Sequence, residues 1–193
     1  YMIQQLAEMM GKKGTYVDMV GDLTSTSHNA WADAAIEYQK EKYPDMTLID
    51  ERLESQVNAE VAYEKAKEIL KKYPDLGGIL GCSSFCPLGS AKAVAELGLD
   101  TKVFGNGTML TCEAALRDHT LQAITFWDPA LTAQAMANLA VMVLENGKDA
   151  VKDGADLGCE GYTSVVMDAE RSNILYGAAL VYGTLENFEE YPF

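Results

Sequence analysis

The sequence predicts an α/β fold, a doubly wound three-layer parallel sheet of the Rossmann-like kind with helices on both faces. Apolar strand patterns alternate with amphipathic helical patterns up to about residue 147. Some strand patterns are short and wholly apolar, such as Leu76–Leu80, which is typical of strands buried on both faces of a parallel sheet. Several helical patterns are followed directly by a proline or glycine, the residues that commonly end a helix. They are Pro44, Pro74 and Gly98.

The first part of the chain alternates helix and strand, with polar loops between them. Apolar residues recur at helical spacing in the helices, and β-branched or aromatic residues mark the strands. The expected elements are a helix over Tyr1–Met10, a strand over Thr15–Val20, a helix from a cap at Ser25 or Thr26 to Tyr43, a strand over Met46–Leu53 and a helix over Asn58–Tyr73.

The same alternation continues to residue 148, and then it changes. Residues 149–193 are polar and Gly-containing at first and hold only short strand-like pieces, over Tyr162–Met167, Ile174–Tyr176 and Ala179–Val181. We therefore predict an α/β lobe over residues 1–148 and an irregular tail over residues 149–193 that crosses away from the lobe or packs on it. The remaining elements of the lobe are strands over Leu76–Leu80, Val103–Gly105 and Leu121–Phe126 and helices over Leu88–Leu97, Thr111–His119 and Ala130–Leu144.

Composition narrows the class of protein. Fifteen Lys and Arg against 29 Asp and Glu give a net charge of −14, and no basic run provides the cations that phosphate contacts need, so nucleic acid is not an expected partner. No apolar stretch approaches the roughly 18 residues of a membrane-spanning helix. The cysteines form no paired CxxC motifs and are interpreted as idle thiols; they are Cys82, Cys86, Cys112 and Cys159.

Candidate site residues are those that follow the predicted strands, because ligands of open α/β sheets bind at the carboxyl ends of the strands. Hydroxyls, amides and flat aromatic faces gather there, and these groups suit a sugar or polyol. Plainer roles stay open: Ser25 and Thr26 as helix caps, Trp31 as core, and Asn106 in a tight turn. The set comprises Asp22, Thr24, Ser25, Thr26, Ser27, His28, Asn29, Trp31, Ser83, Ser84, Phe85, Asn106, Thr108, Trp127, Asp128 and Pro129.

Catalytic and cofactor motifs are absent from the sequence. It holds no GxSxG, Walker loop, GxGxxG or HExxH pattern, so no catalytic residue, metal site or cofactor is predicted. A cysteine nucleophile paired with His28 stays open, since both would lie at the same end of the sheet. The sequence favours a binding protein over an enzyme.

Four ordered segments resemble the type I periplasmic sugar-binding proteins, the solute receptors of ABC importers, and within them the rhamnose and autoinducer-2 binding branch. They read "TSTSHNAWADAAIEY", "LGGILGCSSFCPLGSAKAVAELG", "KVFGNGT" and "LQAITFWDPALTAQAMANLAV". The resemblance implies two α/β lobes joined by three crossing segments, with ligand held between them. This chain is similar to the second, C-terminal lobe, so the first lobe would precede Tyr1. The helix over residues 130–147 would then pack on that first lobe or on another surface.

Position by position, the resemblance implies a set of ligand contacts. Ser27, His28 and Asn29 stand where the autoinducer-2 branch has Asp-Gln-Asn, so the Asp contact is replaced by Ser. Cys82 and Ser84 fall at main-chain and side-chain contacts of that branch. Asn106 corresponds to a polar position used by pentose binders, and Trp127, with Asp128 beside it, to a neighbouring contact. The complete predicted ligand-binding set is Ser27, His28, Asn29, Trp31, Cys82, Ser84, Phe85, Asn106, Trp127 and Asp128.

The sequence therefore predicts the substrate-binding component of an ABC importer, which binds a sugar or sugar-like solute and signals closure to a membrane permease. We expect a periplasmic or extracellular protein, anchored as a lipoprotein if the source is Gram-positive, and self-association of the chain where a lobe is missing. One alternative is the effector-sensing core of a transcriptional repressor of the same fold. Another is a small α/β enzyme that uses Cys82 or Cys86.

Overall fold

The computed structural model describes residues 1–49, 52–171 and 173–193. The chain divides into two compact units, which we call unit 1 (Tyr1–Thr125 with Tyr182–Phe193) and unit 2 (Phe126–Val181). The chain thus leaves unit 1 after Thr125 and returns to it at Tyr182. This division differs from the predicted boundary after residue 148, because the alternation of strand and helix continues across the point where the chain leaves unit 1.

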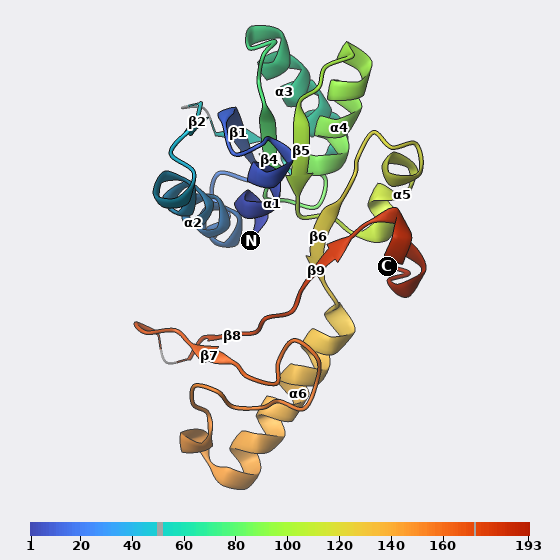
Figure 1. The fold of residues 1–193 in the computed structure, drawn as a ribbon. Coiled ribbons are helices and arrows are strands. Elements are labelled where there is room, and N and C mark those ends of the chain that lie inside the picture. The colour runs from blue at the N-terminus through green and yellow to red at the C-terminus, as the bar shows by residue number, and fades with distance from the viewer. Residues whose placement is uncertain (50–51, 172) are drawn as a thin grey trace. The chain divides into compact units, whose positions relative to one another are not determined.

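Unit 1 is built on a parallel sheet in the order β2-β1-β4-β5, and β3 also pairs with β1 (Figure 1). The wholly apolar strand pattern correctly indicated the buried centre, since all four residues of β4 are buried. The strands are β1 (Gly14–Val20), β2 (Met46–Leu48), β3 (Leu53–Glu54), β4 (Gly78–Gly81) and β5 (Lys102–Gly105).

Helices cover both faces of this sheet. Tyr16, Leu80 and Phe104 pack in one buried cluster with residues of α1 and α2. Successive strand residues point to opposite faces, so the buried Val17, Ile79 and Val103 face the other side, where α3 and α4 lie (Figure 1). The fold class predicted from the sequence, a three-layer α/β lobe, is confirmed. The helices of unit 1 are α1 (Met2–Met9), α2 (Thr26–Lys42), α3 (Ala59–Lys72), α4 (Cys86–Leu97), α5 (Met109–Arg117) and the 3-10 segment η2 (Leu185–Glu190).

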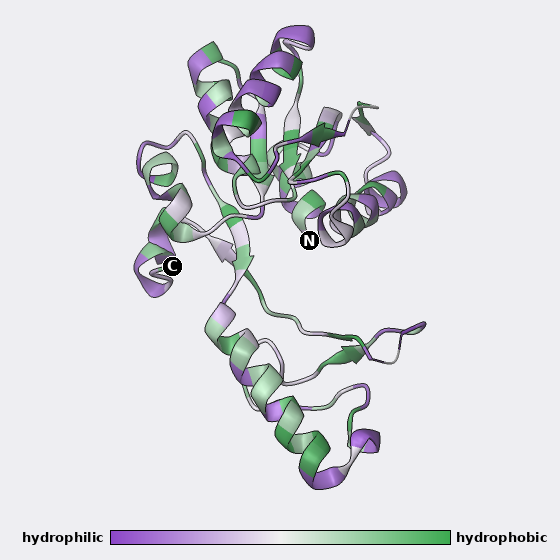
Figure 2. Ribbon diagram, turned by 180° about the vertical axis from the view of Figure 1, so that it is seen from behind, coloured by the Kyte–Doolittle hydropathy of each residue, from purple (hydrophilic) through white to green (hydrophobic). Residues whose placement is uncertain are grey.

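Unit 2 consists of one long helix and a chain that returns along it. Residues of α6 (Pro129–Asn146) cover a small buried cluster made by Ala135, Ala155, Leu157, Cys159 and Val165. Hydrophobic residues occur along much of α6, and Figure 2 shows them on the ribbon. The other elements are the short 3-10 turn η1 (Lys148–Ala150) and the antiparallel pair β7 (Val166–Met167) and β8 (Leu175–Tyr176).

The two remaining strands, β6 (Ile124–Trp127) and β9 (Leu180–Gly183), carry the chain from one unit to the other and pair as a two-stranded sheet. Ile124 is buried, as predicted for a sheet strand. The strand that the sequence predicts here as an element of the lobe's parallel sheet pairs instead with β9. A single parallel bridge, between Asn106 and Thr125, links β6 to the end of β5, because the chain turns away after four residues.

Several predicted boundaries shift. The strand predicted over Met46–Leu53 is two short strands, β2 and β3, and residues 50–51 of that prediction lie outside the described residues. The helix predicted from Leu88 begins at Cys86, because Pro87 sits in its first turn, where a missing N–H costs nothing. The helix predicted from Thr111 begins at Met109, since Thr108 and Thr111 cap each other's backbone N–H.

Two further predictions concern strand ends. The strand predicted over Leu121–Phe126 runs instead over Ile124–Trp127, so Trp127 ends the strand rather than following it. In the predicted tail, the strand pieces shrink to two residues each in β7 and β8, and β9 extends two residues beyond Val181. Short exposed strands carry too weak an alternation for their ends to be read from sequence.

Candidate functional site

The loops after β1, β4 and β5 meet at one end of the sheet. Parallel register places Met19 beside Gly81 and Gly81 beside Gly105, so the three strands finish together. A Cβ on Gly105 would collide with the backbone carbonyl of Gly81, so only glycine allows the strands to approach this closely. The predicted site residues of unit 1 therefore lie at one end of the sheet.

His28 and Ser83 face each other over the glycine that follows β1. A Cβ on Gly21 would lie 2.7 Å from Cε1 and 2.8 Å from Nδ1 of His28, and 2.8 Å from Oγ of Ser83. The imidazole and the hydroxyl thus surround one point, and glycine leaves room for both. Among the described residues, Nδ1 of His28 is buried without a hydrogen-bond partner, and the buried Oγ of Ser83 interacts only with the Cys86 thiol. A buried polar atom without a partner is costly, so Nδ1 of His28 calls for a ligand or water to satisfy it.

The start of α2 positions this imidazole. Ser25 caps the helix, and its Oγ accepts a hydrogen bond from the backbone N–H of His28 at 3.5 Å, as the pattern of hydroxyls predicted. The ring of Trp31 lies 5.8 Å from the His28 ring, centroid to centroid, and also packs on the core cluster. Trp31 therefore combines both predicted roles, core and aromatic wall. Ser27 is exposed, with its hydroxyl 3.4 Å from that of Ser25.

Asn29 is engaged entirely within the protein. Its Nδ2 donates to the backbone carbonyls of Asp22, Leu23 and Ser25 at 3.4, 3.1 and 2.7 Å. Its Oδ1 accepts from Nη1 of Arg52 at 2.8 Å. Asn29 thus fastens the loop that follows β1, which is a structural task beside the predicted ligand contact.

Arg52 was missed by the sequence reasoning. Its guanidinium donates to Asp18 on β1 and to Asp33 on α2, both at 2.8 Å, in addition to Asn29. Asp18 is 1% exposed, and burial raises its pKa against the opposing pull of Arg52. Asp18, an acidic residue inside the apolar strand Thr15–Val20, was the signal in the sequence that a cation such as Arg52 must lie nearby, because a buried carboxylate needs one.

The β4 loop contributes buried thiols and half-buried neighbours. Burial raises the pKa of the Cys82 thiol and that of Cys86, whose Sγ donates to Oγ of Ser55 at 3.3 Å. A nucleophilic cysteine needs a lowered pKa, so these environments disfavour the enzyme alternative. Ser84 and Phe85 are partly exposed beside them, and Phe85 occupies the N-cap position of α4.

Asn106 follows β5 and is 9% exposed. Its backbone N–H donates to the carbonyl of Gly81 at 2.8 Å, and the N–H of Gly107 donates to the carbonyl of Thr125 at 3.0 Å. These bonds hold the chain extended rather than in the tight turn that the Asn-Gly pair allowed. Asn106 therefore lies at the same end of the sheet as His28 and Ser83.

Trp127 and Asp128 belong to unit 2. Trp127 ends β6 and is 37% exposed. Asp128 is the N-cap of α6, and its Oδ1 accepts from the backbone N–H of Ala130 at 2.7 Å and of Leu131 at 3.3 Å. The carboxylate that the sequence assigned to ligand binding thus satisfies a helix terminus.

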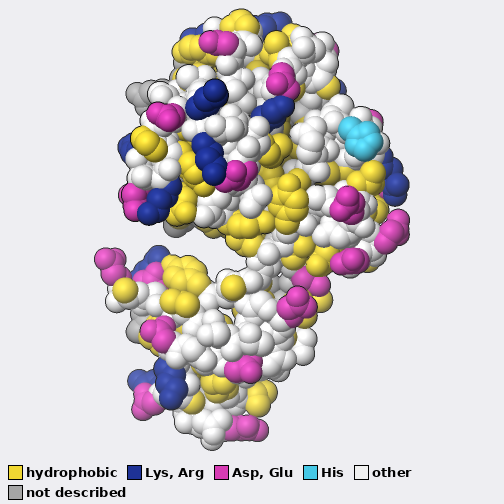
Figure 3. All heavy atoms as spheres, in the orientation of Figure 1, with side chains coloured by type: hydrophobic (Ala, Val, Ile, Leu, Met, Phe, Trp, Pro, Cys, Tyr) yellow, Lys and Arg dark blue, Asp and Glu magenta, His cyan; other side chains and the backbone are white. Residues whose placement is uncertain are grey.

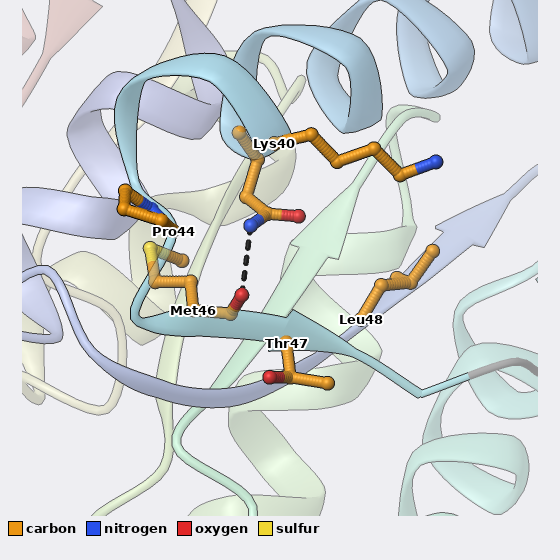
Figure 4. Close-up of a pocket in the computed structure, with 6 residues that line it drawn as sticks. Lys40, Pro44, Met46, Thr47 and Leu48 are labelled. Carbon is orange, nitrogen blue, oxygen red and sulfur yellow. Dashed lines mark hydrogen bonds between the residues drawn. The ribbon is translucent and has the colours of Figure 1, made fainter.

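A surface hollow lies at the opposite end of the sheet from the candidate site. It is lined by the end of α2 and by β2, and β2 begins opposite the first residue of β1 (Figure 4). The Gln39 side chain also lines it, and its Nε2 donates to the carbonyl of Met46 at 2.8 Å, the bond dashed in Figure 4. None of the predicted site residues lines it. The lining residues are Gln39, Lys40, Pro44, Met46, Thr47 and Leu48.

On the face drawn in Figure 3, Lys and Arg side chains lie interspersed with Asp and Glu rather than in a basic patch. Within the described ranges, no group of three or more His, Cys, Asp or Glu side chains is arranged to hold a metal ion.

The chain belongs to the family of periplasmic binding protein domains, which matches residues 1–149. The D-apiose import binding protein of Actinobacillus succinogenes is 24% identical over 151 residues, which cover 76% of this chain and 48% of that protein. This chain therefore spans about half the length of the curated relative that it matches.

Solved structures share the fold. A sugar ABC transporter structure from Actinomyces odontolyticus superimposes with a TM-score of 0.82 at 15% identity, covering 100% of this chain and 62% of that one. A solute-binding protein from Clostridium phytofermentas with bound L-rhamnose gives a TM-score of 0.78 at 16% identity, covering 98% and 62%. The resemblance to periplasmic binding proteins of type I, seen in the sequence, is confirmed by the family match and these folds.

Proposed function

We propose that this chain acts in the substrate-binding component of an ABC importer and supplies one lobe of its site for a sugar or sugar-like solute. The observation that carries the proposal is the buried Nδ1 of His28, which has no hydrogen-bond partner among the described residues and faces Oγ of Ser83 at the carboxyl end of the sheet. That end is where open α/β sheets bind their ligands. The relatives are named as binding and transport proteins, which favours binding without chemistry.

The chemistry of the site suits a neutral polyol. A sugar hydroxyl both donates and accepts, so one hydroxyl can donate to the His28 imidazole and another can accept from Ser83. The half-buried Trp31 ring near His28 offers an apolar face for sugar C–H groups. Within the class, we propose a rhamnose-like or autoinducer-2-like ligand, with Ser27 in place of the Asp contact of that branch.

Completion of the site requires a second lobe. The chain covers about half to two thirds of its relatives' length, and the outward face of α6 carries exposed apolar residues, among them Met136 and Leu144 at 67% and 84% exposed. We propose that first-lobe residues of the same protein cover this face and close over the ligand. Closure would then be read by a membrane permease.

The proposed location is the periplasm or the cell exterior, with a lipid anchor in a Gram-positive source. The family supports this location, since its domains are described as those of periplasmic binding proteins. Across the described residues, helices are all too short or too polar to span a bilayer.

Titration by NMR tests the proposal on the chain itself. The ¹⁵N-labelled chain is titrated with L-rhamnose, D-apiose and autoinducer-2, with sucrose as a larger control. We expect shifts confined to the loops after β1, β4 and β5, with a Kd near millimolar. If two lobes share a micromolar complex of about 8 kcal/mol, the loss of one forfeits several kcal/mol.

Matched variants locate the binding. His28→Ala and Ser83→Ala should each abolish the shifts, whereas His119→Asn, which changes the other histidine in an exposed turn, should leave them unchanged. Shifts that persist in both site variants, or that occur around other elements, would contradict the assigned site. Micromolar binding by the monomeric chain would show that the single lobe holds a complete site.

A further inference from the structure

The loop that follows β1 is held by its hydrogen bonds to one side chain. Asn29 donates to three carbonyls of residues 22–25, and the same loop ends in Ser25, which caps α2 at His28. An amide can make these bonds only while its Nδ2 points into the loop. The orientation of Asn29 therefore sets the orientation of the loop and of the first turn of α2.

Arg52 sets the orientation of Asn29. Its Nη1 donates to Oδ1 of Asn29, which leaves Nδ2 as the end that faces the loop. The guanidinium is itself held, because Nε donates to the buried Asp18 and Nη2 to Asp33. Asp18 lies on the sheet and Asp33 on α2. The guanidinium of Arg52 therefore links the core to the helix that bears His28.

We propose that Arg52 is a positioning residue of the candidate sugar site: through Asn29 it fixes the loop over residues 22–25 and thereby places His28 opposite Ser83. This inference rests on the proposed function for its ligand, but the placement of His28 can be read without any sugar. Arginine is required because its planar fork donates in three directions at once, whereas a lysine ammonium cannot match that geometry.

Two roles of Arg52 must be separated experimentally. Arg52 also neutralises the buried Asp18, and removal of Arg52 alone would leave an unpaired buried charge that destabilises the fold. The matched pair is therefore Asp18→Asn against Asp18→Asn/Arg52→Met. These two proteins share a neutral residue 18 and differ only in Arg52.

The first measurement needs no ligand. The chain has two histidines, so ¹⁵N-histidine spectra resolve His28 from His119, and a His119→Asn variant assigns them. We expect the wild type and Asp18→Asn to show the same His28 ring shifts and a slowly exchanging Asn29 side-chain amide. In Asp18→Asn/Arg52→Met the His28 signal should move and the Asn29 amide should exchange rapidly. Unchanged His28 and Asn29 signals in a folded double variant would overturn the proposal.

The second measurement uses L-rhamnose as the probe. The Kd should weaken about fivefold in Asp18→Asn/Arg52→Met relative to Asp18→Asn, since one net hydrogen bond is worth about 1 kcal/mol. Arg52→Lys in the Asp18→Asn background should not restore it, because an ammonium cannot match the planar guanidinium. Equal affinity in the matched pair would overturn the positioning role. If even the wild type binds no sugar, the proposed function fails, while the ligand-free spectra still decide whether Arg52 places His28.

Discussion

Unit 1 and unit 2 bury apolar residues in different ways. In unit 1 a parallel sheet is covered by helices on both faces, and large side chains such as Tyr16, Leu80 and Phe104 are fully buried. In unit 2 one helix covers a cluster of mostly small residues and leaves Met136 and Leu144 exposed. A helix that is apolar on most sides is normally buried on most sides. Unit 1 thus buries apolar residues on both faces of its sheet, whereas unit 2 leaves apolar residues of its helix exposed.

Matched leucines in the two units should show the largest difference. Leu80→Ala, in the sheet core, should lower the free energy of unfolding by about 3–4 kcal/mol, because it leaves a cavity among rigid neighbours. Leu157→Ala, in the unit 2 cluster, should cost about 2 kcal/mol or less, because a small cluster can collapse and opens locally at low free energy. Urea unfolding and amide exchange measure both. Equal losses spread over the whole chain would contradict the comparison.

Substitutions by lysine on the two faces of α6 should differ in their effect on stability, by less than the two leucine-to-alanine substitutions do. Leu139→Lys places a charge against the buried cluster and should destabilise unit 2 by about 2 kcal/mol. Leu144→Lys changes an 84% exposed residue, so stability should stay within about 0.5 kcal/mol. Leu144→Lys should instead reduce self-association in sedimentation at high concentration. A stable, monomeric wild type would mean that the exposed face of α6 needs no partner.

The pKa values of one aspartate in each unit are shifted in opposite directions, and the resulting pH dependence of stability should be the smallest of these effects. Burial raises the pKa of Asp18 in unit 1, so its contribution to stability is present below its unfolded pKa and is lost as pH rises through the folded pKa. Hydrogen bonds from Arg171 and Tyr176 lower the pKa of Asp168 in unit 2, so its contribution is present above the unfolded pKa and is lost as pH falls. Carboxyl ¹³C shifts should show Asp18 titrating above 3.8 and Asp168 below it; the reverse order would refute both assignments.

Much of the candidate site was readable from local sequence. His28, Ser83 and Asn106 are polar residues that follow apolar strands in the sequence. Because parallel strands end on the same side, their position alone predicted that they lie at the carboxyl end of the sheet. Ser83 was in that set but outside the final ligand-binding set, and only the packing around Gly21 showed that its hydroxyl faces Nδ1 of His28, which has no partner among the described residues.

Arg52 and Asp128 show the limit of such reading. Asp128 was interpreted as a ligand contact, but its oxygen caps α6, a role that an Asp-Pro pair before a helix also predicts. Arg52 carries no local signature, since its three partners come from β1 and α2, between 19 and 34 residues away in sequence. A side chain that acts through distant partners is visible only once the chain is folded.

The sequence by itself determined the α/β class, the order of helices and strands in the lobe, and the end of the sheet at which polar groups gather. These follow from periodicity, helix caps and strand apolarity, which act over a few residues. The tertiary structure decided that the chain leaves unit 1 after Thr125, that Asn29 turns inward to hold its own loop, and that α6 keeps an exposed apolar face. Those outcomes depend on which distant surfaces meet, and the free energy of such contacts is not encoded in any short stretch of residues.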